Sequence, residues 1–108
     1  MIEIRKYKTN NGKIPFDQWL IELKDPIAKI RILARLKKFA EGLEGDWKSA
    51  GGGVRELRIS VGKGYRVYYG WNGKTVVILL CGGNKSTQQQ DIEKAKAYWS
   101  DYCELFKE

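Results

Sequence analysis

Histidine is absent from this sequence, which removes the usual general base and the commonest metal ligand. The two cysteines, Cys81 and Cys103, are too few for a zinc site or a disulfide framework. Glycine-rich nucleotide loops and an HExxH motif are also missing. No apolar run approaches the roughly 18 residues of a membrane span, and the N-terminus lacks the apolar core of a signal peptide. We therefore expect one cytoplasmic domain, residues 1–108, with no metal, no cofactor and no membrane partner.

Positive charge is what the sequence has in excess: 20 Lys and Arg stand against 13 Asp and Glu, a net charge of +7. Residues 54–85 contain six cations and a single acid, whereas residues 86–108 are net acidic. A basic balance favours a polyanionic partner, although many basic proteins bind none. Charge alone therefore leaves nucleic-acid binding open.

The N-terminal half predicts one strand and two helices. Apolar and polar residues alternate over Ile2–Arg5, as in a strand. Apolar residues three and four apart predict helices over Pro15–Leu23 and Pro26–Glu41, the second with Asp25 as its N-cap. Apolar residues cover so much of the second helix that we expect it to pack against both a helix and a sheet: Ile27, Ile30, Ile32, Leu33, Leu36, Phe39, Ala40 and Leu43.

The polar side of this second helix carries a basic ridge, which consists of Arg31, Arg35 and Lys38. It is either a solvated face or a contact line for a polyanion or an acidic partner. The glycine-rich segment Gly42–Gly53 is expected to be a mobile loop, in which Trp47 fills the core or offers a stacking surface.

The C-terminal half predicts an antiparallel meander and a last helix. Strands are expected from Val54, over Tyr65–Tyr69 and over Thr75–Cys81, with an Asn-Gly hairpin signal before the last. Gly82 and Gly83 are expected to let the backbone leave the sheet. A capping box at Ser86 then opens the helix. The fold class is thus α+β: a strand, a helical hairpin, a meander sheet and a C-terminal helix.

Strand parity separates the cations of the meander. Arg58 and Arg66 fall on the same face of adjacent strands, and Lys85 follows the end of the central strand. Converging cations suit a phosphate, which arginine grips with its planar fork. Glu56 is the one nearby carboxylate that could act as a base. The alternative is an exposed basic sheet face that pairs with acids of the C-terminal helix.

Further side chains of the meander suit contacts with RNA. Tyr65, Tyr68 and Tyr69 offer stacking or hydroxyl contacts, Lys63 stands in the turn between the strands, and Arg55 has the parity of the buried side. We expect Arg55, Lys63, Tyr65 and Tyr68 to bind RNA.

Three motifs occur in order: Gly53-Val54-Arg55-Glu56-Leu57-Arg58-Ile59, Gly64-Tyr65-Arg66-Val67-Tyr68-Tyr69-Gly70 and Leu79-Leu80-Cys81-Gly82-Gly83-Asn84-Lys85-Ser86. Together they resemble the RelE/ParE superfamily of toxins, and most closely its HigB-like branch of phage Gp49-related "addiction module killer" proteins. The resemblance covers almost the whole chain, including the helix with Phe16 and Trp19 and the segment that begins at Asp91.

The resemblance implies the fold of an endoribonuclease. It also implies that the protein cuts mRNA on the ribosome without metal. The family's phosphate-binding cations correspond to Arg58, Arg66 and Lys85. The chain departs from both types of toxin in one respect each. RelE-type toxins have a catalytic tyrosine late in the chain, where this chain has Asp91. HigB-type toxins use histidines, and this chain has none.

A toxin of this kind implies an antitoxin partner that carries a helix-turn-helix domain. Two other functions stay open: a ParE-like inhibitor of DNA gyrase and a non-catalytic basic RNA-binding module.

Overall fold

The structure is a computed structural model, and it describes residues 1–106. Its elements follow in the order β1 (Glu3–Lys6), α1 (Pro15–Glu22), α2 (Pro26–Ala40), β2 (Trp47–Gly51), β3 (Val54–Ile59), β4 (Tyr65–Asn72), β5 (Val76–Asn84), the 3-10 turn η1 (Lys85–Thr87) and α3 (Gln88–Leu105). The α+β class and the order strand, two helices, sheet and helix are confirmed.

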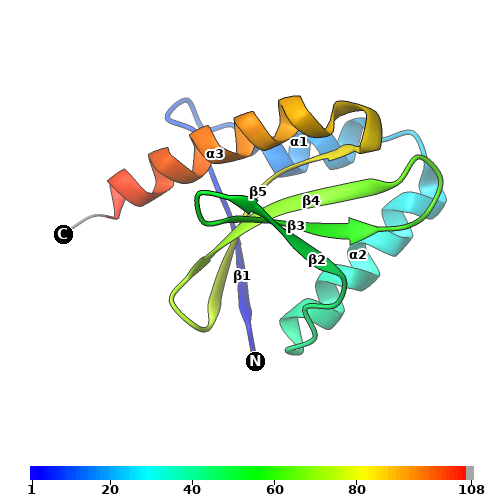
Figure 1. The fold of residues 1–108 in the computed structure, drawn as a ribbon, viewed down its shortest axis with the longest axis horizontal. Coiled ribbons are helices and arrows are strands. Elements are labelled where there is room, and N and C mark those ends of the chain that lie inside the picture. The colour runs from blue at the N-terminus through cyan, green and yellow to red at the C-terminus, as the bar shows by residue number, and fades with distance from the viewer. Residues whose placement is uncertain (107–108) are drawn as a thin grey trace.

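The five strands form one sheet in the order β1-β5-β4-β3-β2. Strand β1 runs parallel to β5, and every other neighbouring pair is antiparallel. Helices α2 and α3 lie on opposite sides of the sheet (Figure 1). The sheet is therefore a middle layer with two cores, and its long central strand β5 is buried over most of its length.

Helices α1 and α2 cover one face of the sheet. Apolar side chains of both helices pack there on the inward residues of β3, β4 and β5, and the core includes Phe16, Ala28, Ile32, Leu36, Phe39, Leu57, Val67 and Leu79. Helix α3 covers the other face, where its side chains join Val54, Tyr68, Ile78 and Leu80 in a second core. Asp25 caps α2 as predicted, because its Oδ1 accepts a hydrogen bond of 3.0 Å from the Ala28 amide.

The segment Gly42–Gly53 was predicted to be a loop, but it contains the edge strand β2. Trp47 pairs with Leu57 in the sheet. The residue is 40% exposed, so its side chain does not fill the core. The strand is held by its ladder with β3, since its own residues, WKSAG, have little strand preference.

The outer face of α2 is also not as predicted. Ile27, Ile30 and Leu33 were expected to pack against a second helix, but they are 61%, 67% and 52% exposed. Within residues 1–106, the side of the helix that packs on the sheet is the stripe with Ile32 and Phe39. The helix thus presents to solvent an apolar strip that the described part of the chain leaves largely exposed.

The end of β5 differs in two details from the prediction. Gly82 and Gly83 remain in the strand, where a Cβ atom would lie 2.3 Å from the Trp19 ring and 1.8 Å from the Asp91 carboxylate, respectively. Both glycines thus allow helices to approach the strand closely. The cap before α3 is centred on Asn84 instead of Ser86, since the Asn84 side chain accepts from the Ser86 and Thr87 amides. Across residues 1–106, no helix is long and apolar enough to cross a membrane.

Candidate functional site: a cation cluster at the β3–β4 turn

Four cations line one open cleft beside the β3–β4 turn. Arg58 and Arg66 stand directly opposite each other in the ladder between β3 and β4, which confirms their predicted common face. Lys63 projects from the turn, and Lys85 begins η1 immediately after β5. The cleft has a volume of about 410 Å³. We call Arg58, Lys63, Arg66 and Lys85 the cation cluster.

The turn itself allows this convergence. Gly64 has a φ of +73°, a left-handed conformation that favours glycine. A Cβ atom at this position would lie only 3.7 Å from the Lys85 Cβ and 3.9 Å from the Arg66 Nη1. The Gly64 backbone thus lies between two of the cations and brings them close to each other.

Arg66 is the most enclosed member of the cluster, with a side chain only 11% exposed. Its Nη1 donates a hydrogen bond of 3.2 Å to the Gly64 carbonyl, and its Nε lies 3.7 Å from Glu56 Oε1. The Nε is buried and makes no hydrogen bond within residues 1–106. The Nε is therefore a buried donor that has no acceptor in the described part of the chain, which is costly in a protein interior.

Glu56 is buried below Arg66, with a side chain only 2% exposed. Its two oxygens accept hydrogen bonds of 3.2 and 3.0 Å from the Gln88 Nε2 at the start of α3. A carboxylate enclosed in this way contacts Arg66 rather than the cleft. Its geometry suits orientation of the guanidinium, and it does not suit the proton acceptor expected from the sequence.

Arg58 lies at the open side of the cluster, with 41% of its side chain exposed. Its Nε is 3.9 Å from Asp46 Oδ2, and its amide donates a hydrogen bond of 2.9 Å to the Asp46 carbonyl. The Asp46 side chain is 57% exposed, so an accessible carboxylate stands beside the cluster. Sequence reasoning missed Asp46, since the pairing of β2 with β3 that brings it there was not predicted.

The basic ridge of α2 adjoins the cluster. Arg31, Arg35 and Lys38 line a cleft of about 380 Å³ that shares Arg58 with the first cleft. The guanidinium of Arg35 is occupied by backbone carbonyls, including that of Arg58 at 2.6 Å, and it fixes the end of β3. Arg31 and Lys38 are exposed, so positive charge continues from the cluster along α2.

Arg55 lies on the other face of the sheet, away from the cluster. It forms an ion pair of 3.0 Å with Glu44, and its guanidinium stacks 3.9 Å from the centre of a Trp47 ring. These contacts on the α2 side match its parity in the sequence. The structure does not bring Arg55 together with Arg58 and Arg66.

Tyr65 and Tyr68 lie near the cluster, but their side chains are only 4% and 0% exposed. The Tyr65 hydroxyl donates a hydrogen bond of 3.2 Å to Asp25. Burial, reinforced by the charges of Glu56 and Asp91, raises the pKa of Tyr68, so its phenol stays protonated. Neither ring has a free face on which a base could stack.

Cys81 is buried and does not line this cleft. Burial raises the pKa of the Cys81 thiol to about 12, so that this thiol is no nucleophile at neutral pH. Within residues 1–106, no group of three potential His, Cys, Asp or Glu ligands is placed to hold a metal ion. Four converging cations can stabilise negative charge, and stabilisation of this kind is often the largest single contribution to catalysis.

Known proteins are similar to this chain over most of its length. A family model described as "Phage derived protein Gp49-like (DUF891)" matches residues 18–99. A protein of Haemophilus influenzae described as uncharacterized is 52% identical over 83 residues, which make up 77% of this chain and 84% of the relative. The match of the family model spans α2, the cation cluster and most of α3.

Proposed function

This chain belongs to the Gp49-like family, a toxin-like family of addiction modules, and we propose that it is a ribosome-dependent mRNA endoribonuclease of RelE/HigB type. It would act in the cytoplasm, where its substrate is mRNA on the ribosome. The observation that carries the proposal is Arg66, an enclosed arginine that lies among three other cations and whose buried Nε has no acceptor among the described residues.

Each member of the cluster has a separate part in the proposed reaction. Arg66 and Arg58 stabilise the charge on the pentavalent phosphate, and Lys85 holds the same group from the end of β5. Glu56 positions the Arg66 guanidinium. Asp46 is the accessible carboxylate beside Arg58, and we propose that it takes the proton of the attacking 2′-hydroxyl in place of Glu56. As the 2′-oxygen bonds to phosphorus, the bond to the 5′-oxygen breaks, and solvent water protonates the departing 5′-oxygen.

The outer face of α2 suits the antitoxin that such a toxin needs. Helix α2 carries five cations and no acid, and its exposed apolar strip consists of Ile27, Ile30 and Leu33. An acidic amphipathic helix would bury this strip and pair with the cations around it. We assign this face to the antitoxin, which we expect to carry a helix-turn-helix domain as well.

Lys85→Ala tests the proposed nuclease, because Lys85 is exposed and makes no hydrogen bond or ion pair with the described residues. Loss of one charge-assisted contact costs about 2 kcal/mol, so we expect about 30-fold slower cleavage of mRNA on ribosomes. Lys74→Ala removes the same charge from the exposed β4–β5 turn, away from the cleft, and should cleave like the unchanged protein. Equal cleavage by both variants would remove Lys85 from the mechanism.

The same experiments distinguish the nuclease from two other functions. A gyrase inhibitor would block plasmid supercoiling and leave mRNA intact. A non-catalytic RNA-binding module would bind RNA with a steep salt dependence and without cleavage. The enclosure of Arg66 beside the buried Glu56 favours the nuclease, since a guanidinium held in a fixed position suits the charge that develops on a phosphate during cleavage.

A further inference from the structure

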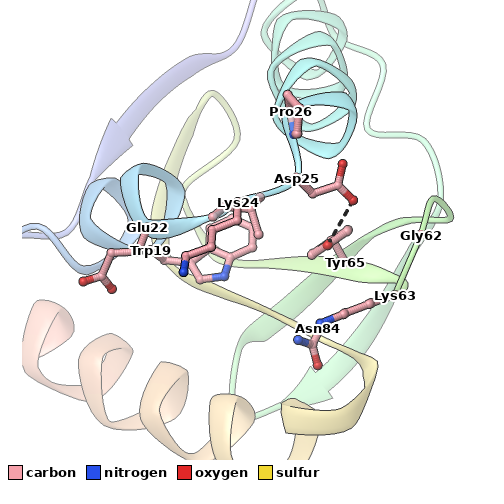
Figure 2. Close-up of a pocket in the computed structure, with 10 residues that line it drawn as sticks. Trp19, Glu22, Lys24, Asp25, Pro26, Gly62, Lys63, Tyr65 and Asn84 are labelled. Atoms are coloured by element: carbon pink, nitrogen blue, oxygen red, sulfur yellow. Dashed lines mark hydrogen bonds between the residues drawn. The ribbon is translucent and has the colours of Figure 1, made fainter.

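The two ends of the cation cluster are fixed by different contacts. At the β3–β4 turn, the Tyr65 hydroxyl donates a hydrogen bond to Asp25, which ties β4 to the start of α2 beside Lys63 (Figure 2). At the other end lies Asp46, in the loop between α2 and β2. Its side chain is 57% exposed, so its place beside Arg58 depends on the loop that carries it.

Glu44, two residues before Asp46, anchors this loop on the α2 side of the sheet. Its carboxylate is 20% exposed and accepts hydrogen bonds from Arg55 Nη1 at 3.0 Å, from Trp71 Nε1 at 3.3 Å and from the Tyr69 hydroxyl. Burial, together with the hydrogen bond to Glu44, raises the pKa of Tyr69, so this phenol stays a donor at neutral pH. The loop is therefore held to β3 and β4 by one saturated carboxylate.

Arg55 holds the chain on both sides of Asp46. Its guanidinium forms the ion pair with Glu44 and stacks 3.9 Å from the centre of a Trp47 ring. Side chains alternate along a strand, so a Trp47 side chain held on the α2 side directs the preceding Asp46 to the opposite face, where Arg58 lies. One guanidinium thus sets the direction of the Asp46 side chain from the other side of the sheet.

The backbone of the same loop is held by Arg35 of α2. Its Nη2 donates hydrogen bonds to the carbonyls of Glu44 and Asp46, both at 3.3 Å. Gly45 has a φ of +77°, and a Cβ atom there would lie 2.7 Å from this nitrogen, so glycine is required for the approach. Exposed loops are commonly mobile, whereas this one is restrained at its side chains and at its backbone.

We propose that Arg55 is a positioning residue for Asp46. By holding Glu44 and Trp47, it keeps the Asp46 carboxylate beside Arg58, where that carboxylate takes the proton of the 2′-hydroxyl. This inference rests on the proposed function, because Asp46 accepts that proton only if RNA is cleaved. It gives Arg55 a part in the reaction other than the RNA contact expected from the sequence, since its guanidinium is occupied on the α2 side.

Measurement of ¹⁵N relaxation tests the positioning without RNA. In the unchanged protein we expect the Gly45, Asp46 and Trp47 amides to be rigid, with order parameters of about 0.85, and Arg55→Met should lower them below about 0.6. Arg5→Met removes an arginine from an exposed ion pair with a glutamate of β1 and should leave them unchanged. Equal order parameters in Arg55→Met and the unchanged protein would overturn the positioning role.

A double-variant cycle shows whether Arg55 acts through Asp46. Arg55→Met should lower kcat for cleavage of ribosome-bound mRNA by about 10-fold and leave KM unchanged, because the carboxylate is displaced while the cation cluster is intact. In the Asp46→Asn background the same substitution should cause no further loss, since the carboxylate that it positions is gone. A further loss of about 10-fold in the double variant would show a general structural role and overturn the proposal.

A milder variant covers the case in which Arg55→Met is unstable. Trp47→Leu removes the stacking partner at a residue that is 40% exposed and leaves the ion pair of Arg55 with Glu44. It should slow cleavage by a smaller factor than Arg55→Met, and that slowing should also disappear in the Asp46→Asn background. A slowing that persists there would contradict the positioning.

The two measurements separate this inference from the proposed nuclease. Intact mRNA with the unchanged protein would refute the nuclease, and with it the role of Asp46 in the reaction, while the order parameters would still show whether Arg55 fixes the loop. Normal cleavage by the unchanged protein, together with an equally rigid loop in Arg55→Met, would refute the positioning role alone.

Discussion

Replacement of Arg66 by methionine would separate the structural role of this arginine from its proposed catalytic role. Glu56, which is 2% exposed, would lose its ion-pair partner and keep only the hydrogen bonds from Gln88. Breaking a buried ion pair costs about 3–5 kcal/mol, and we take the lower limit because Arg66 is partly exposed. At about 4 °C for each kcal/mol, the melting temperature should fall by about 12 °C.

A second substitution tests where this loss comes from. In the double variant Arg66→Met/Glu56→Gln neither side chain of the former pair is charged, and the neutral Gln side chain can still bond to Gln88. We expect the free energy of unfolding to return to within about 1 kcal/mol of the unchanged protein, because buried pairs add little net stability. Cleavage should not return, since the phosphate has lost a stabilising donor worth about 100-fold or more in rate.

Urea denaturation followed by circular dichroism measures the stability of the unchanged protein and of the single and double variants. Cleavage of a ribosome-bound mRNA, followed by primer extension, measures their activity under conditions where each variant is folded. A stable double variant that cleaves at the original rate would refute the assigned role of Arg66. An equally stable single variant would refute the buried pair.

The remaining predictions concern other parts of the molecule. Asp46→Asn should slow cleavage by 100-fold or more with little change in melting temperature, and Asp101→Asn, a carboxylate remote from the cluster, serves as the activity control. A thiol reagent at pH 8 should label the exposed Cys103 in the folded protein but not the buried Cys81. A thiol with a pKa of about 12 has about one thiolate in ten thousand molecules at that pH. Rapid labelling of both cysteines would contradict the burial of Cys81. Ile30→Asp should weaken co-purification with the antitoxin by ten-fold or more and leave mRNA cleavage unchanged, whereas unaltered co-purification would place the antitoxin on another face.

Strand parity was the most informative feature of the sequence. The alternation in β3 and β4 correctly placed Arg58 opposite Arg66 and put Arg55 on the other face, because side chains alternate strictly along a strand. The cap at Asp25 was also predicted correctly, since a single Asp before a Pro is a local signal.

Features that depend on tertiary contacts were not predictable in the same way. Parity could place Glu56 on a face but could not show that α3 and Gln88 bury it. Asp46 reaches Arg58 only through the β2–β3 ladder, and β2 has no strand signal of its own. The outer strip of α2 looked like core because apolar periodicity does not distinguish a buried face from a face that awaits a partner.

Cleavage of mRNA on translating ribosomes tests the central claim most directly. The unchanged protein and Lys74→Ala should cut the message at the same sites and rates, and Lys85→Ala should be about 30-fold slower. Plasmid supercoiling by gyrase, measured in parallel, should be unaffected by all three. Intact mRNA together with inhibited gyrase would contradict the account.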